Sequence, residues 1–247
     1  MRSCAKFLAR NIPSTLTTLN NLAVAYGKMG EYGKEAEVQE KLFDIRFQLL
    51  GEENPLTIAV LDRLAEIYEK IGDHRKTAET LEKLYSCQCL VLGEKHPDVL
   101  RILNNLAAAY NRAGDDQKFA EVKEKYYDAV RKISGEENPK TLMLLNQLAD
   151  AYIKLEKFEE ARKMKEKVYD VRSKILGFEH PDTLKTLEGL AVIDWKLGDD
   201  EKAFENMKKV YRLYSKLFGK SDANTLRSKE TLEEIRKNLS FFQKIFK

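Results

Sequence analysis

A glycine recurs every 42 residues along most of this 247-residue chain, and a proline usually follows it four residues later. The pairs are Gly51 with Pro55, Gly93 with Pro97, Gly135 with Pro139 and Gly177 with Pro181, while Gly219 has no such proline. A fixed period of this length indicates stacked units that bury their apolar faces only against their neighbours. We therefore expect one elongated repeat domain, with function on the surface that the repeats share.

Each unit predicts two helices, here called helix A and helix B. A proline suits the first helical position because its missing amide would have no partner there, so helix A of the third unit should begin near Pro97. Apolar residues then recur at spacings of three and four until Gly114 interrupts them. Helix B should end before Gly135, where a left-handed cap conformation favours glycine.

The apolar stripe of helix A recurs in all five units, and we expect it to form the core. It comprises Leu19, Leu22, Ala23 and Tyr26; Leu61, Leu64, Ala65 and Tyr68; Leu103, Leu106, Ala107 and Tyr110; Leu145, Leu148, Ala149 and Tyr152; and Leu187, Leu190 and Ala191, with Asp194 in place of tyrosine. Helix B ends in apolar pairs such as Leu49 with Leu50 and Ile175 with Leu176, which we expect to pack on the following helix A.

Composition narrows the function classes. The 43 Lys and Arg nearly balance the 40 Asp and Glu, so no overall positive charge favours nucleic acid. No apolar run approaches the roughly 18 residues of a membrane span, and the first residues lack the apolar centre of a secretory signal. We predict a cytoplasmic protein without membrane insertion, with its three cysteines unpaired. Without a phosphate loop, a metal-ligand cluster or a nucleophile paired with a base, we predict no cofactor and no enzymatic activity.

The pattern L-x-x-L-A-x-x-Y, then glycine, then an aromatic residue such as Tyr32 or Phe158, then Ala161 or Ala203, resembles the tetratricopeptide repeat. Its longer period and its G-E-x-H/N-P junctions resemble the 42-residue variety found in kinesin light chains. The resemblance covers roughly residues 9–226 and implies an all-α, right-handed α-solenoid of stacked antiparallel helix pairs, the tetratricopeptide superhelix. Glu35, Thr77 and Phe119 depart from it at a position that is usually alanine, which predicts local repacking of helix B.

The register predicts a single solenoid over residues 1–247. We place repeats near 9–50, 51–92, 93–134, 135–176 and 177–218, with the end of a preceding helix B at 1–8 and a degenerate repeat or cap at 219–247. A chain that starts inside a repeat is consistent with a fragment of a longer array. For the apolar tail, with Phe241, Phe242, Ile245 and Phe246, two hypotheses stay open: it covers the last repeat, or it makes a docking or oligomer contact.

Function is expected on helix A, because the resemblance implies that its outward positions line a concave groove for extended peptides. Side-chain amides there can donate to and accept from a peptide backbone, although they can also bond to adjacent repeats and only order the stack. The cation near the end of each helix A can contact a ligand or only complement the helix dipole. The candidate groove residues are Asn20, Asn21, Lys28, Arg63, Lys70, Arg101, Asn104, Asn105, Arg112, Asn146, Gln147, Lys154 and Lys185.

Amides beside cations suit an acidic peptide, but carboxylates on the same surface make the groove mixed in charge. These carboxylates are Asp62, Glu66, Asp150 and Glu188. We therefore predict a non-catalytic scaffold or adaptor that binds a protein or an extended peptide of acidic or mixed charge, and no nucleic acid. The alternatives are a self-assembly module, with a homo-oligomer formed through the C-terminal tail, or a regulatory repeat domain of a larger protein.

Overall fold

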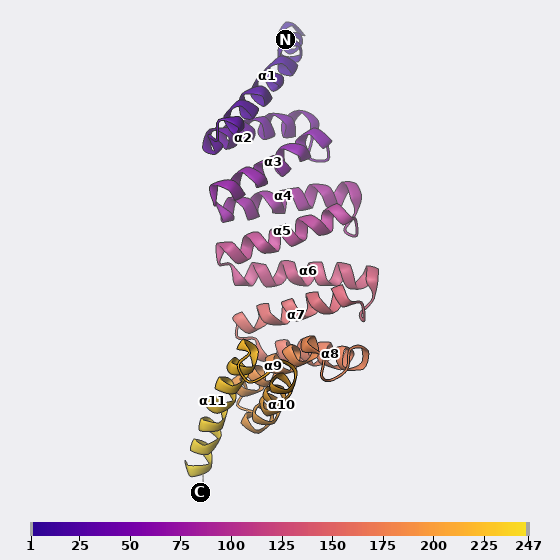
Figure 1. Ribbon diagram of the computed structural model, residues 1–247. Helices are drawn as coiled ribbons and strands as arrows, with labels where there is room; N and C mark the ends of the chain where they lie inside the picture. The colour runs from indigo at the N-terminus through magenta and orange to yellow at the C-terminus, as the bar shows by residue number, and fades with distance from the viewer. Residues whose placement is uncertain (1, 246–247) are drawn as a thin grey trace. The chain divides into compact units, whose positions relative to one another are not determined.

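A computed structural model describes the backbone of residues 2–245 and the side chains of residues 14–239. This part of the chain forms eleven helices and contains no strand, which confirms the all-α class (Figure 1). The helices are α1 (Arg2–Lys28), α2 (Tyr32–Leu50), α3 (Pro55–Ile71), α4 (His74–Leu92), α5 (Pro97–Ala113), α6 (Asp116–Ser134), α7 (Pro139–Lys154), α8 (Phe158–Ile175), α9 (Pro181–Lys196), α10 (Asp200–Phe218) and α11 (Ala223–Ile245). Among the described residues, no helix is both long enough and apolar enough to cross a bilayer.

The contacts divide the chain into two compact units, residues 1–129 and residues 130–247, with the division inside α6. In the first unit, each helix from α1 to α4 packs against the next helix along the chain. In the second unit, the helices from α7 to α11 do the same. Each unit is thus a stack of helix pairs joined by short turns, as Figure 1 shows.

The prolines begin helices as predicted. Pro55, Pro97, Pro139 and Pro181 are each the first residue of a helix. A polar residue precedes each proline and accepts a hydrogen bond from the second helical amide: Asn54 Oδ1 accepts from Leu56 at 2.9 Å, and His96 Nδ1 accepts from Asp98 at 3.2 Å. Such caps satisfy an amide that has no partner inside the helix, so they fix where helix A starts.

The glycines between repeats correct one prediction. Gly51 has φ 83° and ψ 174°, so its backbone is not in the expected left-handed helical conformation. That conformation is found instead at the turn inside a helix pair, where Gly72 has φ 82° and ψ 13°. The chain leaves Gly51 extended because it must reach the next helix start within four residues, and this combination of angles is nearly restricted to glycine.

The predicted core stripe is buried in the second and third repeats, where Leu61, Leu64, Leu103 and Leu106 are each at most 4% exposed. In the first repeat, however, Leu22 is 41% exposed, because α1 is the first helix of its stack and packs chiefly against α2.

The apolar pairs at the ends of helix B do not pack as expected. Leu49 and Leu50 are 47% and 43% exposed, and Ile175 and Leu176 are 56% and 43% exposed. Consecutive residues of a helix point about 100° apart, so both members of a pair cannot face the following helix A. These pairs leave an apolar edge on each unit.

The last helix, α11, packs into the core of the second unit. At the C-terminal end, Ile235 of α11 is fully buried in one cluster with Leu187 of α9 and Met207 of α10. The side chains of the apolar tail, for which capping and an oligomer contact are both open, lie outside the described residues, as does that of Cys4, the third cysteine. Cys87 and Cys89 are unpaired, as predicted.

Candidate functional site

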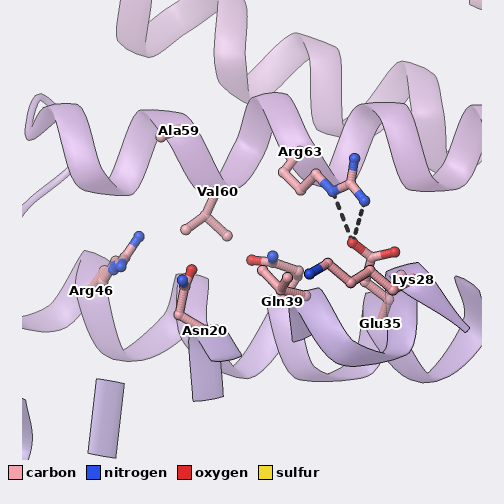
Figure 2. Close-up of a pocket in the computed structure, with 10 residues that line it drawn as sticks. Asn20, Lys28, Glu35, Gln39, Arg46, Ala59, Val60 and Arg63 are labelled. Atoms are coloured by element: carbon pink, nitrogen blue, oxygen red, sulfur yellow. Dashed lines mark hydrogen bonds and ion pairs between the residues drawn. The ribbon is translucent and has the colours of Figure 1, made fainter. Parts of the chain in front are cut away.

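A cavity of about 390 Å³ opens between α1, α2 and α3 in the first unit (Figure 2). Helices α1 and α3 form its walls, and α2 contributes Glu35, Gln39 and Arg46 between them. The lining residues are Asn20, Val24, Gly27, Lys28, Glu35, Gln39, Arg46, Ala59, Val60 and Arg63. Three cations thus face one carboxylate, so the cavity carries an excess of positive charge.

The length of the cavity suits an extended chain. Arg46 and Glu35 lie at opposite ends of the lining in Figure 2, eleven residues apart on α2. At 1.5 Å per helical residue this separation is about 16 Å, which equals about five residues of extended peptide.

An ion pair closes one end of the cavity. The Glu35 side chain is fully buried, and its Oε1 accepts from Arg63 Nε at 2.8 Å and from Nη2 at 2.5 Å. Burial acts to lower the pKa of the Arg63 guanidinium, but its hydrogen bonds to Glu35 and Glu66 outweigh this effect and raise it. Gly27 leaves room for the carboxylate, because a Cβ at that position would lie 2.7 Å from Glu35 Oε2.

The 42-residue period relates all the predicted groove residues to just four lining positions of this cavity. Asn20 corresponds to Asn104 and Asn146; Lys28 to Lys70, Arg112 and Lys154; Ala59 to Arg101 and Lys185; and Arg63 to Asn21, Asn105 and Gln147. In the structure Arg63, Asn146 and Gln147 are half-buried, and the other ten candidates are exposed. Only Asn20, Lys28 and Arg63 of the candidates line this particular cavity.

The predicted cations have different surroundings. Arg112 forms an ion pair with Glu69 of the neighbouring α3, and Arg101 Nη2 lies 3.8 Å from Asp62 Oδ1. Lys70 Nζ lies 5.1 Å from the centroid of the Tyr32 ring, which is a cation–π contact. Lys28 forms no ion pair within the described residues, so its ammonium is available at the cavity.

In the second unit, a lysine of helix B hydrogen-bonds to the corresponding groove residues of helix A. Lys165 of α8 is 4% exposed and donates to Asn146 Oδ1 at 2.9 Å and to Asp150 Oδ1 at 2.6 Å. Burial lowers the pKa of the Lys165 ammonium, and the adjacent Asp150 carboxylate offsets part of this effect. The Asn146 amide therefore links α7 to α8, which is the stack-ordering role considered for this row.

Sequence reasoning missed the residues that α2 contributes to the cavity. The repeat pattern marks Glu35 only as a departure from the usual alanine, which predicts local repacking of helix B. A charged residue at a position where the repeat is normally small and apolar is itself a signal, because a buried charge needs a partner. The structure provides that partner as Arg63 of the following helix A, 28 residues further on.

Comparisons with known proteins agree with this architecture. Residues 14–89 and 140–216 match the tetratricopeptide repeat family. The comparison with curated proteins gave no match.

Solved structures give the same result. The nearly identical TPR-like repeats of a kinesin light chain-like protein from Podosopora anserina are 29% identical, with a TM-score of 0.59 over 83% of this chain and 98% of that one. The protein BtubC (BKLC) from P. vanneervenii is 20% identical, with a TM-score of 0.53 over 88% of this chain and 87% of that chain, a likeness in fold alone.

Proposed function

Because the chain belongs to the tetratricopeptide repeat family, in its kinesin light chain-like form, we propose that it is a non-catalytic scaffold that holds an extended peptide along helix A. The family fold is typical of protein–protein interaction scaffolds. The observation that carries the proposal is the cavity between α1, α2 and α3, whose lining positions recur with the repeat period at every candidate groove residue.

The chemistry of the exposed candidates supports a peptide ligand. Asn20 and Asn104 are exposed and make no hydrogen bond to other described side chains, so both of their amides can bond to a peptide backbone. Lys28 and Arg46 add positive charge, while Asp62 and Glu66 lie on the same helix-A surface of the first unit. The ligand is therefore an extended segment of acidic or mixed charge. We propose that the protein binds it in the cytoplasm and carries no cofactor.

The test is a double substitution, Asn20→Ala with Asn104→Ala, in a chain that binds a peptide selected from a random library. Each lost hydrogen bond contributes about 0.5–1.5 kcal/mol, so the affinity should fall roughly tenfold. The unfolding temperature should not fall, because both side chains are exposed and alanine has a higher helix propensity than asparagine. Fluorescence anisotropy and thermal unfolding measure the two quantities.

The matched control is Gln48→Ala, which removes an exposed amide that does not line the cavity. It should leave peptide affinity unchanged. If the double variant binds as tightly as the native chain, or if the control loses as much affinity as the double variant, the peptide does not lie on the proposed surface.

A further inference from the structure

Arg46 is a half-buried cation on α2 whose donors are only partly used. Its Nη1 donates to the Leu56 carbonyl oxygen at 2.9 Å. Its Nε is buried without a hydrogen-bond partner, and no ion pair to Arg46 exists among the described residues. Burial lowers the pKa of this guanidinium, and no carboxylate of the described side chains counteracts the effect. Partial burial of a cation without a counter-ion is unfavourable, so this site favours the arrival of an anion.

Three repeat periods further on, the equivalent arginine has one more hydrogen-bond acceptor. Arg172 donates to the Asp182 carbonyl oxygen at 3.1 Å, as Arg46 does to Leu56, and also to Thr186 Oγ1 at 2.9 Å. The position that corresponds to Thr186 is Val60, which lines the cavity and offers only methyl groups. Figure 2 shows Val60 between Arg46 and Gln39. Nη1 of Arg172 thus has a side-chain acceptor that Nη1 of Arg46 lacks.

The rest of the cavity wall shows the same contrast. Gln39 is 5% exposed and its Oε1 has no partner, and Glu35 Oε2 likewise has none. The corresponding residues of the second unit are Lys165, which is bonded to Asn146 and Asp150, and Ala161, which has no polar atom in its side chain. Buried polar groups normally have partners, so unpartnered atoms gathered on one cavity point to a missing ligand.

We propose that the cavity between α1, α2 and α3 is a subsite for an aspartate or glutamate side chain of the bound peptide, whose carboxylate pairs with Arg46. The Nε and Nη2 donors form one edge of the guanidinium, which matches the two oxygens of a carboxylate. Asn20, beside Arg46, and Gln39, two turns away on α2, bond to the adjacent peptide backbone. This inference rests on the proposed function and names the ligand group that one part of the groove selects.

The experiment is a display selection of random seven-residue peptides whose C-termini are fused to the carrier, performed with the native chain, Arg46→Gln and Val60→Thr. Val60→Thr is nearly isosteric and supplies the hydroxyl that occupies Arg172 in the second unit. It therefore adds a second acceptor for Arg46 Nη1, as in Arg172, and leaves the Nε and Nη2 donors, the charge and the fold in place. Arg172→Gln is the matched control, and circular dichroism checks that each variant is folded.

The native chain should enrich peptides with an acidic residue at one fixed position. For an enriched peptide made with blocked ends, changing its Asp to Asn should weaken binding to the native chain roughly tenfold or more. The same change should have less than about a threefold effect on Arg46→Gln, because its carboxylate partner is lost. Val60→Thr keeps the Nε and Nη2 donors and should retain the preference. Arg172→Gln should retain the full preference.

Several outcomes contradict the proposal in distinguishable ways. Peptides that bind with an equal acid preference in native and Arg46→Gln chains overturn the subsite and leave the proposed function standing. Binding that requires a free C-terminal carboxylate overturns the assignment to a side chain. If no peptide is enriched above background by any chain, both the subsite and the proposed function are wrong.

Discussion

At the scale of single residues, the turn inside the helix pair of the fourth repeat differs from the others. Gly30, Gly72, Gly114 and Gly198 occupy this turn with φ between 75° and 82°, but the fourth repeat has Glu156 there with φ 58°. A residue with a Cβ in the left-handed region costs about 1–2 kcal/mol relative to the right-handed region. The turn between α7 and α8 therefore holds Glu156 in an unfavourable backbone conformation.

Glu156→Gly should raise the free energy of unfolding of the second unit by about 1 kcal/mol, because glycine adopts positive φ without a steric cost. Urea titration followed by circular dichroism measures the change. Gly114→Ala is the converse control: no atom lies within 4 Å of an added Cβ there, so the expected loss of stability reports conformation alone. A less stable Glu156→Gly variant would show that the glutamate side chain stabilises the turn.

At the scale of helices, Asp194 of α9 replaces the tyrosine of the repeat pattern and is held by its neighbours. In the second and third repeats, Tyr68 and Tyr110 donate to Glu40 and Glu82 of the preceding helix B. Asp194 is instead fully buried, with its Oδ1 3.1 Å from Arg162 Nε of α8 and 3.6 Å from Lys202 Nζ of α10. Arg162 stands where earlier repeats have alanine, so the two departures from the pattern compensate each other.

Because of this network, we predict that the free energy of unfolding depends on pH. Burial raises the pKa of Asp194 above its ordinary 3.8, and the nearby cations only partly oppose this. The folded chain therefore binds more protons than the unfolded chain between pH 3.8 and the raised value, and the stabilisation associated with the protonated carboxyl is lost as the pH rises through that window.

Relative to Asp194→Asn, the native chain should become less stable with rising pH across this window, by at most about 1.4 kcal/mol per pH unit. Urea unfolding of both chains from pH 3.5 to pH 7 measures the difference, and other carboxylates cancel in the comparison. A difference that grows in favour of the native chain as the pH rises would contradict the role given to burial.

Much of the helix architecture follows from the sequence, because proline, cap residue and apolar stripe all repeat with one period. The extended backbone at Gly51 and the exposure of Leu49 and Leu50 could not be predicted from the sequence. Both depend on how two consecutive helices meet. The helix-A rows of the candidate site were also predictable from the register. The α2 residues were not, because the unpartnered Nε of Arg46 depends on how α2 packs between α1 and α3.

At the scale of the whole molecule, the chain offers two kinds of exposed surface in the first unit. One is the helix-A surface with its cavity, which is polar and carries excess positive charge. The other is the apolar edge at the ends of helix B, with Leu49 and Leu50 on α2 and Leu90 and Val91 on α4. We also propose that residues 1–247 act as one solenoid domain with a cap at 219–247. The central claim is that a partner peptide lies on the first surface and not on the second.

Photo-crosslinking locates the peptide directly. A peptide selected by the native chain is synthesised with a photoreactive residue at its centre, crosslinked to the full chain, and mapped by mass spectrometry after digestion. The account predicts attachment on α1, α2 and α3 beside Asn20, Gln39 and Arg63, with the crosslink lost when unlabelled peptide competes. Attachment at Leu49, Leu50, Leu90 or Val91, with the cavity residues unmodified, would contradict it.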